Sequence, residues 1–190
     1  MPRAGLSPAV VTRLALEELD ECGPDALTLK AVATRAGVAT PSLYKHVQSL
    51  EKLRDLMAVT VLDEAAAEIG DAVMGRSGRD ALEAFLFAYR GYAQRRPHRW
   101  TLIEHPTSAD PAVADPAVLA SAARLVEIAY AVVRGFGLAA EQQVDAVRTL
   151  RAAVTGFIAL EHGGGFQLAR DLDASFRYLI AVLAKGLGTN

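Results

Sequence analysis

Two short helical patterns separated by a glycine occupy residues 28–48, and this spacing constrains the fold more than any other feature of the sequence. The first pattern begins at Thr28, a suitable N-cap, and continues with apolar residues at helical spacing to Ala36. Gly37 follows, and a glycine can take the positive φ with which the chain turns sharply. Because the second pattern begins only three residues later, the segment is predicted to form a helix-turn-helix.

The second helix of this motif is predicted from the sequence TPSLYKHV at residues 40–47. Thr40 is the expected N-cap, and Pro41 is the first helical residue, where its missing N–H carries no cost. At about 100° per residue, Leu43 and Val47 point toward the preceding helices. The opposite face is predicted to be polar and outward, and it comprises Pro41, Ser42, Tyr44, Lys45 and Gln48.

Positive charge is concentrated around the same motif. Residues 26–50 contain Lys30, Arg35 and Lys45 and no acid, whereas the whole chain has a formal net charge of −2. A basic stretch inside a neutral domain is typical of a surface that contacts phosphate groups. The alternative is that these cations only solvate the surface of the protein.

Helical periodicity continues through the remainder of the chain, and no strand-like alternation interrupts it. We therefore predict an all-α protein. In this prediction, a compact three-helix head occupies residues 1–48, and a larger helical body occupies residues 49–190.

The lengths of the apolar stretches and the cysteine content bear on the cellular location of the protein. No apolar stretch is expected to reach the roughly 18 residues of a membrane helix, because the candidates near Val126 and Val182 are interrupted or flanked by charge. Cys22 is the single cysteine and excludes an intramolecular disulfide, so the cytoplasm is the expected location. Cys22 also completes the apolar stripe of the first helix and is expected to lie in the core.

Neither a metal site, a cofactor nor an enzymatic activity is predicted. The four histidines form no H-x-x-x-H or H-E-x-x-H pair. The sequence HGGG at residues 162–165 is similar to the oxyanion loop of lipases and esterases, but the G-x-S-x-G elbow that must accompany it is absent. The glycines are therefore interpreted as a break between two helices.

Residues 27–57, LTLKAVATRAGVATPSLYKHVQSLEKLRDLM, resemble the DNA-binding segment of the TetR family of transcriptional regulators. The positions that carry the resemblance are Gly37-Val38, Pro41, Leu43-Tyr44, His46-Val47 and Leu53. The resemblance implies a TetR-like fold of about nine helices and double-stranded operator DNA as a partner, with the second helix of the motif in the major groove. The residues implied in DNA binding are Thr28, Lys30, Thr40, Pro41, Ser42, Tyr44, Lys45 and His46.

The resemblance also implies a role for each of these residues. Thr28, Tyr44 and His46 would bind phosphates. Lys30 would contact the DNA backbone or a base edge. The residues that would face bases are Thr40, Pro41, Ser42 and Lys45. One position departs from the family pattern, because Leu50 stands where many members have a lysine. That phosphate contact is missing unless Lys52 replaces it.

The body resembles one subclass of TetR C-terminal regulatory domains in AYRGYAQRRPHRWTLIE and LRAAVTGFIALEHGGGFQLARDLDASFRYLI. This resemblance implies a homodimer formed by the last two long helices, with Gly156 allowing close approach, and a small apolar or amphipathic effector. The expected interface residues are Val154, Phe157, Phe176, Leu179 and Leu183. The expected pocket residues, for each of which ordinary core packing is the alternative, are Phe85, Tyr89, Tyr92, Trp100, Ile103, His105, Tyr130 and Phe136.

Two functions follow from the sequence. The first is a ligand-responsive transcriptional regulator of the repressor type, which binds a near-palindromic operator as a homodimer. The second is a helical protein-interaction module with a TetR-like fold that no longer binds DNA, and Leu50 and the near-neutral charge favour it. The salt dependence of DNA binding distinguishes them, since phosphate contacts release counterions.

Overall fold

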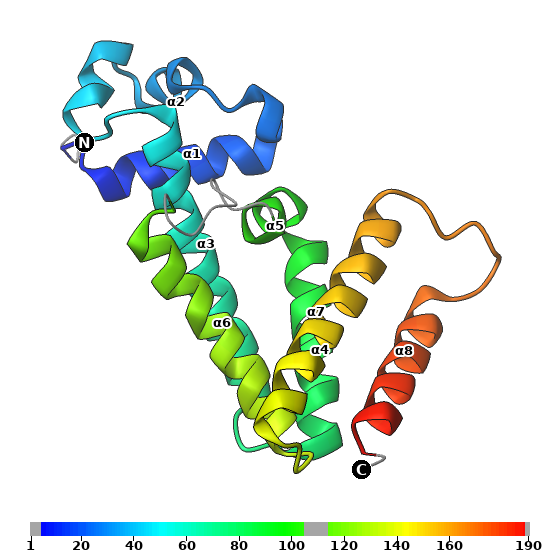
Figure 1. The fold of residues 1–190 in the computed structure, drawn as a ribbon. Helices are drawn as coiled ribbons and strands as arrows, with labels where there is room; N and C mark the ends of the chain where they lie inside the picture. Colours follow the sequence, from blue (N-terminus) through cyan, green and yellow to red (C-terminus); the bar gives the residue numbers. More distant parts are fainter. Residues whose placement is uncertain (1–4, 105–113, 189–190) are drawn as a thin grey trace. The chain divides into compact units, whose positions relative to one another are not determined.

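The computed structural model describes residues 5–104 and 114–188, and all regular elements in these ranges are helical (Figure 1). The predicted all-α class is therefore confirmed. In chain order the elements are α1 (Pro8–Cys22), η1 (Pro24–Ala26), α2 (Leu29–Ala36), η2 (Thr40–Lys45), α3 (Leu50–Val73), α4 (Gly78–Arg95), α5 (Pro97–Glu104), α6 (Pro116–Arg134), α7 (Ala140–His162) and α8 (Leu172–Leu187), of which η1 and η2 are 3₁₀ helices.

The described residues form two compact units. The first comprises those of residues 1–63 and 96–122, and the second comprises those of residues 64–95 and 123–190. The helices α3 and α6 each pass from one unit into the other. The boundary between head and body at residues 48 and 49 stays a prediction.

The first unit is built around α1, whose start and end follow local sequence signals. Ser7 is the N-cap and accepts a hydrogen bond from the backbone N–H of Val10 at 3.3 Å. The helix ends at Gly23, which has a φ of 78°. The core of this unit contains apolar side chains of α1, α2, η2 and α3, among them Val11, Ala15, Leu19, Val32, Leu43 and Leu53.

The prediction that Cys22 lies in the core is wrong, because its side chain is exposed. It is the last residue of α1, so the helix ends before another turn can cover it. Desolvation and a hydrogen bond to the Glu18 carboxylate raise the pKa of the Cys22 thiol above its ordinary value. The thiolate is disfavoured at this position.

The second unit is held together by an arginine of α4 that binds the end of α7 and the start of α8. The Arg90 side chain is buried, with 3% exposure. Its Nε and Nη2 donate to the Glu161 carboxylate at 2.8 and 2.6 Å, and its Nη1 donates to Asp173 at 2.8 Å. The guanidinium carbon lies 5.3 Å from the ring centroid of Phe157 and 4.7 Å from that of Phe176. These contacts fix α4, α7 and α8, which pack against one another (Figure 1).

Among the described helices, α6 is long and apolar enough to cross a bilayer by length and composition, with a mean hydropathy of 1.6. Arg124 and Glu127 interrupt its apolar sequence on either side of Val126, as expected from the sequence. Core helices of water-soluble proteins meet the same criteria, so composition alone is weak evidence for a membrane span.

Replacing Arg90 by methionine is expected to lower the free energy of unfolding by about 3 kcal/mol, because the largely buried Glu161 carboxylate loses its partner. Urea denaturation at a fixed protein concentration measures this change. The control is Arg79→Met, which removes an exposed arginine at the start of α4. Equal unfolding midpoints for the two variants would show that the Arg90 cluster contributes nothing to stability.

Acid is expected to weaken the same cluster. The hydrogen bonds and charge of Arg90 hold the pKa of Glu161 below its ordinary value of 4.5. Stabilisation from this shift is complete above the unfolded-state pKa and is lost as the pH falls through the lower, folded-state pKa. The unfolding midpoint of the parent should therefore fall more steeply below the ordinary carboxyl pKa than that of Glu161→Gln. Parallel pH profiles would contradict this assignment.

Candidate nucleic-acid interface

The turn between α2 and η2 has the geometry that the sequence predicts. Thr28 caps α2, and its hydroxyl oxygen accepts a hydrogen bond from the backbone N–H of Ala31 at 3.1 Å. The helix ends at Gly37, whose φ of 67° and ψ of 31° are left-handed. No atom lies within 4 Å of a Cβ built on Gly37, so the glycine is required by its backbone conformation rather than by lack of space.

The second helix of the motif differs from the prediction in type and at both ends, since it ends at Lys45 rather than at Val47. It is a 3₁₀ helix, η2, and its N-cap is Ala39 rather than Thr40. The backbone N–H of Ser42 donates to the Ala39 carbonyl at 2.8 Å, and this tight i→i+3 bond begins the helix one residue earlier than expected. The N–H groups of His46 and Val47 both donate to the Leu43 carbonyl, at 2.8 and 2.9 Å.

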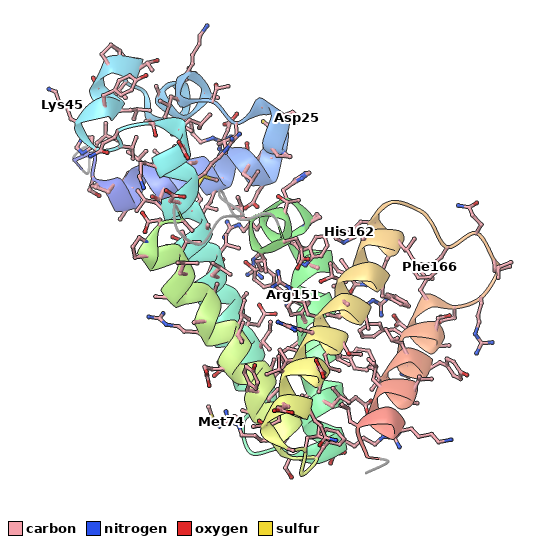
Figure 2. All side chains as sticks on the ribbon, in the orientation of Figure 1. Asp25, Lys45, Met74, Arg151, His162 and Phe166 are labelled. Carbon is pink, nitrogen blue, oxygen red and sulfur yellow. The ribbon has the colours of Figure 1, made fainter. Side chains whose placement is uncertain are left out.

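The two faces of η2 are divided as the sequence predicts. Leu43 and Val47 are buried in the first unit, whereas the Tyr44 side chain is 56% exposed. Figure 2 shows the labelled Lys45 side chain on the outer side of η2. Of the residues implied in DNA binding, Thr28, Lys30, Pro41, Tyr44 and Lys45 are exposed, and Thr40, Ser42 and His46 are partly exposed. The structure therefore brings these residues to the surface of one unit.

Arg35 does not belong to this outward-facing group, although it contributes to the basic stretch in the sequence. Its Nε donates to Glu18 of α1 at 2.7 Å, and its Nη1 and Nη2 donate to Glu21 at 3.0 and 2.5 Å. These hydrogen bonds, led by those to Glu21, raise the pKa of Arg35. The guanidinium therefore joins α2 to α1, and the basic stretch offers fewer cations to phosphate than its composition suggests.

Lys52, which the sequence offers in place of the family's lysine at position 50, is engaged by two acids. Its Nζ donates to Asp55 at 3.1 Å and to Asp115, which precedes α6, at 3.2 Å. Hydrogen bonds to Asp55 and then Asp115 raise the pKa of Lys52. Asp115 also accepts from the backbone N–H of Ala117 at 2.8 Å, and this bond and Lys52 lower the Asp115 pKa. Lys52 thus links the starts of α3 and α6.

The residues predicted to line an effector pocket lie in different units. Phe85, Tyr89 and Tyr92 are buried on α4, and Tyr130 and Phe136 are partly exposed, all in the second unit. Trp100 and Ile103 are buried on α5 in the first unit, and His105 lies outside the described residues. Burial of this kind is also what ordinary core packing produces. The pocket assignment therefore stays a prediction.

The structure changes which residues can form a dimer interface. Val154, Phe157 and Phe176 are buried inside the second unit, where the two phenylalanine rings pack with centroids 4.9 Å apart. Their surface is used within one chain, so the prediction of these three as interface residues is revised. Leu179 and Leu183 are partly exposed. The exposed residues of the same two helices include polar and charged ones together with the small or apolar Ala152, Gly156, Leu160, Tyr178 and Val182.

Comparisons with known proteins agree with this geometry. Residues 82–183 match the tetracyclin repressor-like, C-terminal domain family, and residues 11–55 match the bacterial regulatory proteins of the tetR family. Rv0681 of Mycobacterium tuberculosis, an uncharacterized HTH-type transcriptional regulator, is 35% identical over 185 residues, which cover 97% of this chain and 83% of that protein.

Solved structures show the same fold. A protein with unknown function from Rhodococcus sp. RHA1 has a TM-score of 0.84 at 20% identity, over 100% of both chains. BioQ with its natural double-stranded DNA operator has a TM-score of 0.68 at 19% identity, over 98% of this chain and 100% of that one. Together with the helix-turn-helix geometry and the sequence matches, this establishes that the chain belongs to the TetR family of bacterial transcriptional regulators.

Proposed function

We propose that the chain represses transcription as a homodimer that binds a near-palindromic operator and is released by a small effector. The observation that carries this proposal is that Leu43 of η2 and Val47, two residues after the helix ends, are buried while the polar edge of η2 projects outward. A helix held in this way presents side chains to base edges in a major groove.

Contacts to DNA are proposed for both helices of the motif. The Thr28 hydroxyl oxygen already accepts from the Ala31 N–H, so its own hydrogen is available to a phosphate oxygen. Lys45 and Ser42 face base edges, and Pro41 offers apolar contact to a thymine methyl group. Tyr44 and His46 are proposed to contact phosphates. Lys30 is proposed to contact the DNA backbone or a base edge, and Thr40 is proposed to contact bases.

Dimerisation is proposed through the exposed surface of α7 and α8. No atom lies within 4 Å of a Cβ built on Gly156, so the position is open to a partner helix. Tyr178 of α8 is 71% exposed, a large apolar area for a monomer to leave in water. A dimer also places two heads on successive major grooves, about 34–36 Å apart.

Release by an effector is proposed to work by population shift. A small apolar or amphipathic effector would bind the body more tightly when the spacing of the two heads does not match the operator. The operator affinity then falls by the free energy with which the effector prefers that conformation. The partly exposed Leu179 and Leu183 lie on α8, so a change in this helix reaches the proposed dimer face directly.

A second function, that of a protein-interaction module without DNA binding, is favoured by the charges of the first unit. Arg35 and Lys52 are both engaged by acids, and Leu50 supplies no charge. Titration with salt separates the two functions. An operator-binding protein loses affinity linearly on log–log axes as several counterions are released, whereas an interaction module shows weak affinity with a flat profile.

Lys45→Ala and Tyr44→Ala are each expected to lower operator affinity by about 1–3 kcal/mol, because each removes one contact while leaving the buried anchors intact. Fluorescence anisotropy with labelled operator measures the change. Arg79→Ala serves as control, since it removes an exposed cation from the second unit. Parent-like affinity in both η2 variants would place this helix outside the groove.

Gly156→Leu is expected to weaken the dimer, because a branched side chain then occupies the surface that the partner helix approaches. Sedimentation velocity over a range of protein concentrations measures the dimer fraction. The matched control is Ala67→Leu, at an exposed position of α3. A dimer that is as stable in Gly156→Leu as in the control would exclude this part of α7 from the interface.

A further inference from the structure

The first unit contains a groove of about 390 Å³ that the function proposed above does not use. This volume is in the range of small-molecule sites, roughly 300–1,000 Å³. Its floor is formed by Leu19, Leu27 and Ala58, all of which are buried. The other lining residues are Pro24, Arg54, Thr101 and Leu102.

An ion pair joins the two walls of this groove. One wall is the end of α1 with η1, and the other is α5. Arg99 of α5 donates to both carboxylate oxygens of Asp20 in α1, through Nε at 3.0 Å to each and Nη2 at 2.7 Å to one. Beside this ion pair, Gly23 lies against the imidazole of His98, and a Cβ there would be 3.5 Å from its Cε1. α1 and α5 are therefore in contact beside the groove.

Arg54 gives the groove its charge. It makes no hydrogen bond or ion pair with another residue in the ranges 5–104 and 114–188, although Arg35, Lys52 and Arg99 of the same unit are all paired. The Thr101 hydroxyl donates to the His98 carbonyl at 2.7 Å. Among the lining side chains, the Arg54 guanidinium is therefore the donor that remains for a ligand.

An apolar floor with one half-exposed guanidinium at its side selects a particular kind of molecule. The aliphatic side chains favour a hydrocarbon chain or ring. The guanidinium favours a carboxylate, which accepts two parallel hydrogen bonds from it. We propose that this groove binds a small amphipathic carboxylate, with its carboxylate on Arg54 and its apolar part over Leu19, Leu27 and Leu102.

Such a ligand contacts α1, η1, α3 and α5 at once, all within the unit that carries the helix-turn-helix. Because it binds the folded unit and not the unfolded chain, it stabilises the fold as its concentration rises. None of the residues that line this groove is among those predicted to line the effector pocket. Its existence also does not depend on whether the protein binds DNA.

The test is isothermal titration calorimetry of the full chain with octanoate as the probe. Saturable binding of one octanoate per chain is expected, and octanol, which lacks the charge, should bind at least about tenfold more weakly. Arg54→Met should weaken octanoate binding by a similar factor. Leu102→Glu, at a half-exposed position of α5, should also weaken it, because a second carboxylate then faces the ligand.

Arg79→Met is the control for loss of a cation outside the groove, and it should bind octanoate like the parent. Thermal unfolding of each variant without ligand shows whether it is folded; if Arg54→Met does not fold, the octanol comparison and Leu102→Glu decide. Absence of saturable binding would overturn the proposal. So would equal binding of octanol and octanoate, or octanoate binding that neither groove substitution changes.

Discussion

Burial of two aliphatic side chains determines which side chains of η2 face outward from the first unit. Leu43 and Val47 lie in the core, and η2 is too short to be stable or oriented without such packing. The left-handed Gly37 brings η2 back against α2, so that these two side chains meet the core. With the anchors in place, Tyr44 and Lys45 extend away from the protein. The proposed operator reading rests on this arrangement, because only outward-projecting side chains reach base edges.

Three described cations of the first unit join helices to one another. Arg35 joins α2 to α1, Lys52 joins α3 to the start of α6, and Arg99 joins α5 to α1. Arg90 joins α4 to α7 and α8 in the second unit. Because its side chain is buried, the loss of its acidic partners would cost more free energy than at an exposed site. In the proposed function, DNA affinity therefore depends on the exposed Lys30 and Lys45, on hydroxyl groups and on shape. Arg54 stands apart from this pattern, which is why its groove is of interest.

Features that depend on local sequence were predictable, and features that depend on distant partners were not. The helical class, the turn at Gly37 and the burial of Leu43 in η2 and of Val47 just after it follow from periodicity and one glycine. The pairing of Arg35 with acids 14 and 17 residues away leaves no trace in the local charge count. In α7, apolar residues cover two faces, and periodicity alone does not identify the inner one. Phe157 was therefore assigned to the wrong face, and the exposed Tyr178 was missed.

Selection of bound sequences from random duplex DNA, with the parent and Lys45→Ala in parallel, tests the central claim most directly. The parent should enrich two inverted half-sites with centres about 10 base pairs apart, or one further turn. Lys45→Ala should lose the preference for one base in each half-site and keep the same spacing. Identical enriched sequences from both proteins, or a parent that enriches none, would contradict the assignment of η2 as the helix that reads the operator.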